Sequence, residues 1–199
     1  LGTGSTAHQF IYALGRGVQD GLRLAGAVAS SQDSEDLATS VGITVSDLDT
    51  YPEIDLYVDG ADEVDPQLHL IKGGGGALLR EKIVASTARR FIVITDTTKQ
   101  VARLGTRFPV PVEIIPFGAT PVRKRLEALG AIIQVRMHGD TVFVTENSNM
   151  IFDCTFTGGI AHPEELDAHL HSIVGVVETG LFLNFAQEAI IAGPDGIKT

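Results

Sequence analysis

Apolar segments alternate with amphipathic segments through the first half of the chain. Four short apolar runs have the length and composition of buried strands: residues 24–29, 43–45, 54–58 and 91–95. Apolar residues recur at helical spacing in three further segments, which begin after Thr6, after Ser31 and after Gly76. Strands that alternate with helices predict a parallel sheet that is covered by helices on both faces.

The pattern changes after Pro109. Short elements of both kinds follow in this order: a helix at 121–129, strands at 131–136, 141–145 and 150–156, a helix at 163–171 and extended chain at 173–178. This succession predicts a small α+β unit with an antiparallel sheet. The apolar run at residues 189–192 is expected to rejoin the parallel sheet.

These elements predict an α/β chain with two domains. A parallel-sheet domain is expected to comprise residues 1–105 and 178–199, and a smaller α+β domain residues 106–177. Ligands of parallel sheets collect at the carboxyl ends of the strands. Four polar segments would lie there: residues 2–7, Ser30, residues 59–63 and residues 95–99.

Composition and charge narrow the classes of function. The 199 residues carry a formal net charge of −10, which argues against nonspecific nucleic-acid binding and against docking on anionic membranes. The single cysteine, Cys154, cannot form an internal disulfide, so a cytoplasmic location is expected. No apolar run approaches the roughly 20 residues of a membrane-spanning helix.

An acidic turn, Asp59-Gly60-Ala61-Asp62-Glu63, follows the strand predicted at residues 54–58. The carboxylates of Asp59 and Asp62 could bind a divalent metal, bind sugar hydroxyls, or share acid–base work. Glu63 and Asp65 could complete a metal site. Solvated acids in an ordinary turn would be the simpler interpretation of one aspartate, but the neighbouring segments favour a chemical role.

Lys72 directly precedes four consecutive glycines, residues 73–76. The residue order of a nucleotide-binding P-loop is absent, so no nucleotide phosphate site is predicted. A lysine beside flexible backbone N–H groups suits a developing oxyanion instead.

The helix predicted after these glycines carries a carboxylate, Glu81, on its apolar face. At roughly 100° per residue, Glu81 falls in the middle of an arc of about 120° that contains Ala77, Leu78, Val84, Ala85 and Ala88. Burial raises a carboxyl pKa toward the range of a general base. A lone glutamate would more simply cap the helix or pair with Arg80 or Lys82. The adjoining acidic turn and glycine loop favour catalysis.

The chain opens with Gly2-Thr3-Gly4-Ser5-Thr6, ahead of a predicted helix. Small and hydroxyl residues at a helix start leave backbone N–H groups free to bind a phosphate, although an ordinary N-cap would look the same. A phosphate loop normally follows a strand, so a further segment is expected before Leu1. Together, these groups suit proton transfer next to a carbonyl in a sugar phosphate.

Four motifs resemble the signatures of ribose-5-phosphate isomerase type A, and their spacings fit that family: Gly2-Thr3-Gly4-Ser5-Thr6, Asp59-Gly60-Ala61-Asp62-Glu63, Lys72-Gly73-Gly74-Gly75 and Arg80-Glu81-Lys82. The resemblance continues through Lys99-Gln100 to the end and covers essentially the whole chain. It implies interconversion of ribose 5-phosphate and ribulose 5-phosphate through a cis-enediolate, without a metal or an organic cofactor.

The resemblance also implies a role for each motif. Glu81 would move the proton between C1 and C2, Asp59 would assist ring opening, and Asp62 would bind substrate hydroxyls. Lys72 would stabilise the enediolate oxygen. Contacts to the substrate would come from these residues: Thr3, Gly4, Ser5, Thr6, Asp59, Gly60, Ala61, Asp62, Lys72, Gly73, Gly74, Gly75 and Lys99.

For the fold, the family implies a Rossmann-like large domain, a smaller ferredoxin-like domain, and assembly into homodimers or homotetramers. Two rival functions on related folds explain fewer residues. A noncatalytic sugar-phosphate sensor would need neither Lys72 nor a buried Glu81. A coenzyme A transferase-like enzyme would leave the paired aspartates unexplained.

Overall fold

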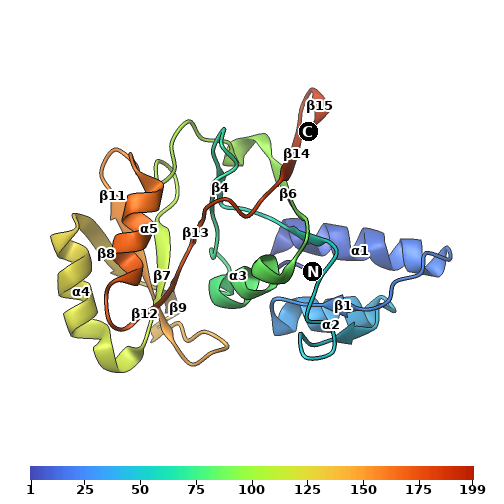
Figure 1. The fold of residues 1–199 in the computed structure, drawn as a ribbon, viewed down its shortest axis with the longest axis horizontal. Coiled ribbons are helices and arrows are strands. Elements are labelled where there is room, and N and C mark those ends of the chain that lie inside the picture. Colours follow the sequence, from blue (N-terminus) through green and yellow to red (C-terminus); the bar gives the residue numbers. More distant parts are fainter. The chain divides into compact units, whose positions relative to one another are not determined.

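A computed structural model describes residues 1–199 and shows a mixed α/β chain with several sheets (Figure 1). The chain divides into two compact units. The first unit comprises Leu1–Gly60, Arg80–Thr97 and Phe185–Thr199, and the second comprises Ala61–Leu79 and Thr98–Asn184. None of the helices combines the length and the hydropathy that crossing a bilayer requires.

A four-stranded sheet forms the centre of the first unit. Its strands are, in spatial order, β15 (Gly196–Lys198), β14 (Glu188–Gly193), β6 (Phe91–Asp96) and β3 (Tyr57–Asp59). Strands β14 and β3 both run parallel to β6, whereas β15 pairs antiparallel with β14. The C-terminal apolar run therefore rejoins a parallel sheet, which confirms that prediction.

The N-terminal part of the first unit holds two helices and two short parallel strands: α1 (Ser5–Gln19), β1 (Ala27–Val28), α2 (Gln32–Ser40) and β2 (Val45–Ser46). Leu1, Ile11, Ala38 and Ile43 form a buried apolar cluster among them. The first two residues lie between strands. The amino group of Leu1 donates to the carbonyl of Val28 at 2.7 Å, and the N–H of Gly2 donates to that of Val58 at 3.0 Å.

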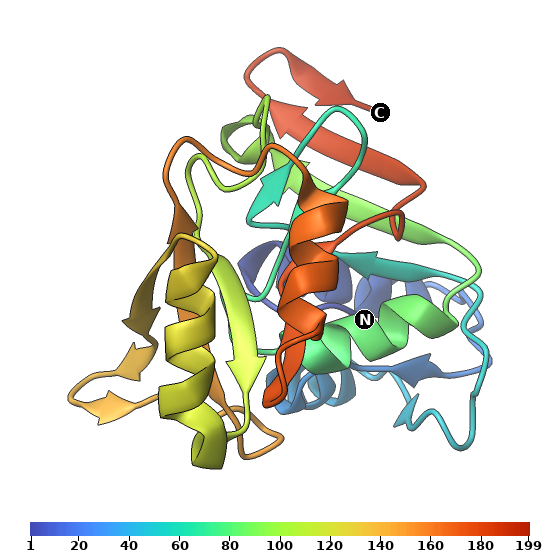
Figure 2. The same cartoon turned by 60° about the vertical axis from the view of Figure 1, so that its left-hand side comes forward.

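A four-stranded antiparallel sheet and two helices form most of the second unit (Figure 2). The strands are, in spatial order, β12 (Val176–Thr179), β7 (Val110–Ile114), β11 (Met150–Phe156) and β8 (Ala131–Val135). Helices α4 (Ala119–Ala128) and α5 (Pro163–His171) contribute Leu126 and Leu170 to the apolar core of this unit, which also contains Val112 and Phe152. These elements agree with the α+β pattern predicted from the sequence.

Smaller elements complete the chain. A short antiparallel sheet and a strand pair lie in the second unit: β4 (Glu63–Val64), β5 (Leu70–Ile71) and β13 (Leu181–Phe182), and β9 (Met137–His138) with β10 (Thr141–Val142). Two 3-10 turns are η1 (Thr97–Lys99) and η2 (Pro116–Gly118). Helix α3 (Leu78–Thr87) begins in the second unit and continues in the first.

Several predicted strands are shorter than expected. Of residues 43–45 only Val45 lies in a strand, and of residues 141–145 only Thr141 and Val142 do. Of residues 24–29, only Ala27 and Val28 pair with another strand. Of residues 54–58, Ile54 exchanges backbone hydrogen bonds with Thr87 and Arg89 at the end of α3 instead of with a sheet neighbour. Of residues 24–29 only Val28 is buried, and Leu56 is 45% exposed, because tertiary contacts decide both burial and the choice of backbone partner.

Candidate active site

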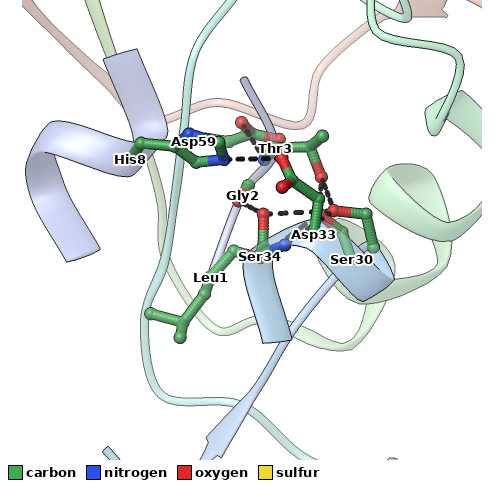
Figure 3. Close-up of polar contacts among 9 residues, drawn as sticks. Leu1, Gly2, Thr3, His8, Ser30, Asp33, Ser34 and Asp59 are labelled. Carbon is green, nitrogen blue, oxygen red and sulfur yellow. Dashed lines mark hydrogen bonds and ion pairs between the residues drawn. The ribbon is translucent and has the colours of Figure 1, made fainter. Parts of the chain in front are cut away.

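Asp59 is the last residue of β3, and its side chain is fully buried in the first unit. Its Oδ1 accepts the backbone N–H groups of Thr3 (3.0 Å) and Gly60 (2.7 Å), and its Oδ2 accepts the hydroxyl of Tyr57. Figure 3 shows Asp59 beside Thr3 in this network. Because both oxygens are held by donors, the carboxylate has a fixed orientation at the carboxyl end of a parallel strand.

Tyr57 belongs to this cluster although no motif points to it. Its ring is fully buried and packs against Phe91, with the ring centroids 4.8 Å apart. Burial, and then the negative charges of Asp59 and Glu81, raise the pKa of Tyr57 well above its usual value. The hydroxyl therefore stays protonated and donates to Asp59. Side chains two residues apart share a face of a strand, and this alternation is the signal that could have identified Tyr57.

The hydroxyl of Thr3 forms hydrogen bonds with two serines at the N-terminus of helix α2. Thr3 Oγ1 lies 2.9 Å from Ser30 Oγ and 2.8 Å from Ser31 Oγ, as Figure 3 shows for Ser30. Gly2 leaves no room for a side chain, because a Cβ would lie 2.1 Å from Cγ of Asp59. These contacts bring Thr3, Ser30 and Asp59 together. The sequence predicted this proximity, because all three were expected at the carboxyl ends of parallel strands.

Helix α1 begins at Ser5, after Gly4 in a backbone conformation with φ of 101° that favours glycine. No side chain accepts a hydrogen bond at this helix start, so the ordinary N-cap interpretation is wrong. The first N–H groups of a helix have no acceptor within the helix and lie at the positive end of its dipole. This helix start is therefore suited to a phosphate group.

Glu81 lies in the first turn of α3, and only 3% of its surface is exposed. Leu78, Val84 and Ala85 are buried as well, which confirms most of the apolar face predicted around Glu81. Ala77 and Ala88, predicted for the same face, are only half-buried. The helix thus carries a carboxylate among apolar side chains.

Lys72 follows β5 in the second unit, and only 2% of its surface is exposed. Its backbone N–H donates to the carbonyl of Gly180 at 2.9 Å. Its Nζ lies 5.4 Å from the centroid of the Phe182 ring, within the range of a cation–π contact. The charge of Lys72 is therefore held in a defined place.

The glycine loop after Lys72 is restrained by specific contacts, although Gly74 and Gly75 are exposed, which differs from the flexible loop that the sequence predicts. The N–H of Gly74 donates to Oδ2 of Asp62 at 2.8 Å, and a Cβ on Gly74 would lie 2.7 Å from Oδ1 of the same carboxylate. At Gly76, with φ of 86°, a Cβ would lie 2.4 Å from the ring of Phe143. The amide of Gly74 is thus bound to Asp62, whereas those of Gly73 and Gly75 take no part in this contact.

The side chain of Glu63 accepts hydrogen bonds from backbone N–H groups. From the sequence, a role as a metal ligand had been an alternative. Its Oε2 accepts the N–H of Gly105 at 2.6 Å, and its Oε1 accepts those of Arg107 at 2.6 Å and Phe108 at 2.8 Å. Asp65 likewise accepts two N–H groups of its own turn. No group of three or more His, Cys, Asp and Glu side chains is placed to hold a metal ion.

The predicted site residues are divided between the two units. Ala61 and Lys99 are half-buried and belong to the second unit. Gly60 is the last residue of the segment Leu1–Gly60 in the first unit. The first unit contains Thr3, Gly4, Ser5, Thr6, Asp59, Gly60 and Glu81, and the second contains Ala61, Asp62, Lys72, Gly73, Gly74, Gly75 and Lys99.

Comparison with known proteins identifies the family. The family model described as ribose 5-phosphate isomerase A (phosphoriboisomerase A) matches residues 26–196. The chain belongs to the ribose 5-phosphate isomerase A family. Within this family, a ribose-5-phosphate isomerase A of Gluconobacter oxydans (strain 621H) is 52% identical over 201 residues, which cover 100% of this chain and 86% of the relative.

Solved structures of the family have the same fold. Ribose 5-phosphate isomerase A from Methanocaldococcus jannaschii matches with a TM-score of 0.94 and 37% identity, over 100% of this chain and 88% of that one. A D-ribose-5-phosphate isomerase solved in complex with phospho-erythronic acid matches with a TM-score of 0.96 and 38% identity. The match covers 100% of this chain and 87% of that one.

Proposed function

We propose that this chain is an aldose–ketose isomerase that interconverts D-ribose 5-phosphate and D-ribulose 5-phosphate, in the non-oxidative branch of the pentose phosphate pathway. The observation that carries the proposal is the 52% identity with a ribose-5-phosphate isomerase A along the whole chain. A buried glutamate in the first turn of α3 supplies the base that such a reaction needs.

Glu81 is the proposed proton carrier. Its carboxylate removes the proton from C2 of the open-chain aldose, and the electrons of that C–H bond form the C1–C2 double bond of a cis-enediolate. Glu81 then returns the proton to C1, while the hydroxyl proton moves from O2 to O1 and leaves a ketone at C2. The buried neighbours Val84 and Ala85 limit competition from water.

Lys72 is proposed to stabilise the negative charge that develops on the enediolate. A buried cation interacts more strongly with such a charge than an exposed one, because water screens it less. The amides of Gly73 and Gly75 add donors. The Gly74 amide instead orients Asp62, which binds substrate hydroxyls.

Asp59 is proposed to carry protons during ring opening. The donors from Thr3, Gly60 and Tyr57 hold its carboxylate in one orientation, which favours directed proton transfer. Gly60 and Ala61 connect it to Asp62 and add substrate contacts.

The start of α1 is proposed to bind the substrate phosphate, through Thr3, Gly4, Ser5 and Thr6. Its uncapped first turn and the conformation of Gly4 support this role. Lys99 adds a further substrate contact. A relative was solved in complex with phospho-erythronic acid, which supports binding of a phosphorylated compound of this kind by this chain.

At a larger scale, we propose a Rossmann-like domain of residues 1–105 and 178–199 and a ferredoxin-like domain of residues 106–177. Parallel pairing of β3, β6 and β14 supports the former, and the antiparallel sheet around β7 and β11 supports the latter. A homodimer or homotetramer in the cytoplasm is expected, and light scattering in solution measures the assembly.

The decisive experiment is an isomerisation assay of Glu81→Gln and Lys72→Ala beside wild type. Loss of a general base predicts that Glu81→Gln lowers kcat by about 10³-fold or more. Since the amide keeps the size of the side chain, binding of ribose 5-phosphate should persist. Glu35→Gln is the matched control, because Glu35 lies exposed in the first turn of α2.

Each alternative outcome has a clear meaning. Wild-type turnover with solvent deuterium incorporated at C1 or C2 supports proton transfer through an exchangeable base. A near-normal kcat for Glu81→Gln rules out its proposed role. Binding of the sugar phosphate without any turnover by wild type would support the sensor instead of the enzyme.

A further inference from the structure

Arg136 connects a strand of the second unit to the glycine loop. It lies between β8 and β9, and its side chain is only 12% exposed. Its Nε donates to Oδ2 of Asp153 at 3.0 Å, and its Nη2 donates to Oδ1 of the same carboxylate. This two-point pairing fixes the plane of the guanidinium group.

The remaining nitrogen of the guanidinium, Nη1, is directed at the loop that follows Lys72. It donates to the carbonyl of Gly73 and, at 3.2 Å, to the carbonyl of Gly74. Arginine stays charged at all relevant pH values, so both hydrogen bonds are charge-assisted.

The peptide group between Gly73 and Gly74 is therefore held at both of its polar ends. Its carbonyl accepts from Arg136, and its N–H donates to Asp62 at 2.8 Å. A peptide group is planar, so fixing its oxygen and its nitrogen fixes its orientation. Glycine has more backbone freedom than other residues, which makes such a restraint more consequential here.

We propose that Arg136 is a positioning residue for the isomerase reaction, which fixes the Gly73–Gly74 peptide and through it Asp62 and the backbone next to Lys72. This inference rests on the proposed function. Displacement of a reacting group by about 1 Å can cost about 100-fold in rate, so a loosened loop should be visible in kcat.

The test compares kcat and KM of Arg136→Ala, Arg136→Lys and wild type. Arg136→Ala should lower kcat by about 100-fold, because the backbone next to Lys72 positions the group that stabilises the enediolate; the effect on Asp62, which binds substrate hydroxyls, should appear as a smaller rise in KM. The kcat of Arg136→Lys should lie between those of wild type and Arg136→Ala, since an ammonium group cannot bind two carboxylate oxygens and two carbonyls together. Added guanidinium, below unfolding concentrations, should partly restore kcat of Arg136→Ala.

Arg103→Ala is the matched control. Arg103 is an exposed arginine of the same unit that donates to a backbone carbonyl, that of Gly158, at 3.4 Å, outside the glycine loop. It should keep wild-type kcat. If Arg136→Ala does not fold, the same split between kcat and KM is required of Arg136→Lys.

The outcomes separate this inference from the function on which it rests. Absence of turnover in wild type would contradict the proposed function. If wild type is active, two results would overturn the role of Arg136. One is an unchanged kcat in the Arg136 variants, and the other is a kcat of Arg136→Ala that guanidinium cannot raise at all.

Discussion

Three carboxylates lie within five consecutive residues, and each has different hydrogen-bond donors. Asp59 accepts from Tyr57 and from two backbone amides, Asp62 accepts from the amide of Gly74, and Glu63 accepts from three amides of the segment that begins at Gly105. A hydrogen bond to a charged group contributes about 1.5–3 kcal/mol to stability. These side chains therefore hold backbone in place besides supplying negative charge.

Tyr57→Phe removes one donor from Asp59 and leaves the buried ring in place. We expect the free energy of unfolding to fall by about 1.5–3 kcal/mol, because the lost hydrogen bond is to a charged group. Urea denaturation measures this change. Tyr51→Phe is the control, since Tyr51 donates to a neutral acceptor, the carbonyl of Ala25, at 2.7 Å. The free energy of unfolding of Tyr51→Phe should fall by only about 0.5–1.5 kcal/mol. Equal losses in the two variants would contradict this account.

Candidate site residues could be recognised in the sequence where a residue was unusual for its place. Glu81 on an apolar helix face and Lys72 before a run of glycines are of this kind. Tyr57 could have been found from strand alternation, because it lies two residues before Asp59, whereas Arg136 is ordinary by local pattern and its importance arises only from contact. Arg136 reaches a carbonyl 62 residues away in the chain, and no local signal encodes such a distance.

Helix boundaries follow local signals more closely than strand boundaries do. Helix α2 begins after Ser31, whose hydroxyl accepts the N–H of Ser34 at 3.2 Å, as the serines before it predicted. Helix α3 spans Leu78–Thr87, within the predicted residues 77–88. Strand ends depend on a distant partner, so the apolar run at residues 54–58 predicted both burial and pairing poorly: only Tyr57 and Val58 are buried, and Leu56 is 45% exposed.

A pH-dependent contact joins helix α5 to strand β12. Hydrogen bonds with Asp167 and then with Glu178 raise the pKa of His171 from 6.5 to about 10. Since the folded pKa is raised, the stabilisation is complete below the unfolded pKa of about 6.5 and is lost as pH rises through about 10. The side chain is 40% exposed, so solvent screening keeps the contribution near or below 1 kcal/mol.

His171→Gln should therefore be less stable than wild type at neutral pH, and the difference should shrink as the pH approaches 10. Urea midpoints measured across this range test it. His169→Gln, at an exposed position of the same helix, is the control. A wild-type advantage that grows with pH would contradict the assigned sign.

At the scale of the whole molecule, the chain passes between its two units several times, at Gly60–Ala61, Leu79–Arg80, Thr97–Thr98 and Asn184–Phe185. The return of the C-terminal strand to the parallel sheet could be predicted, because its apolar run is continuous and short. The other passages fall inside segments that look continuous in sequence, namely the acidic turn, the helix after Gly76 and the polar segment at residues 95–99, so the sequence shows no sign of them.

The charge of the whole molecule predicts its solubility. The net charge of −10 at pH 7 and the pI of about 4.9 imply that mutual repulsion weakens as the pH falls towards 5. Solubility should therefore pass through a minimum near pH 4.9, and turbidity of a concentrated solution measures it. A minimum above pH 6 would show that local patches, and not net charge, control association.

The amides bound by Glu63 have a consequence for the evolution of such chains. Glu63 is fully buried and holds the backbone N–H groups of Gly105, Arg107 and Phe108, so its loss would damage folding whether or not the chain catalyses anything. A descendant that had abandoned the reaction would still be under selection to keep it.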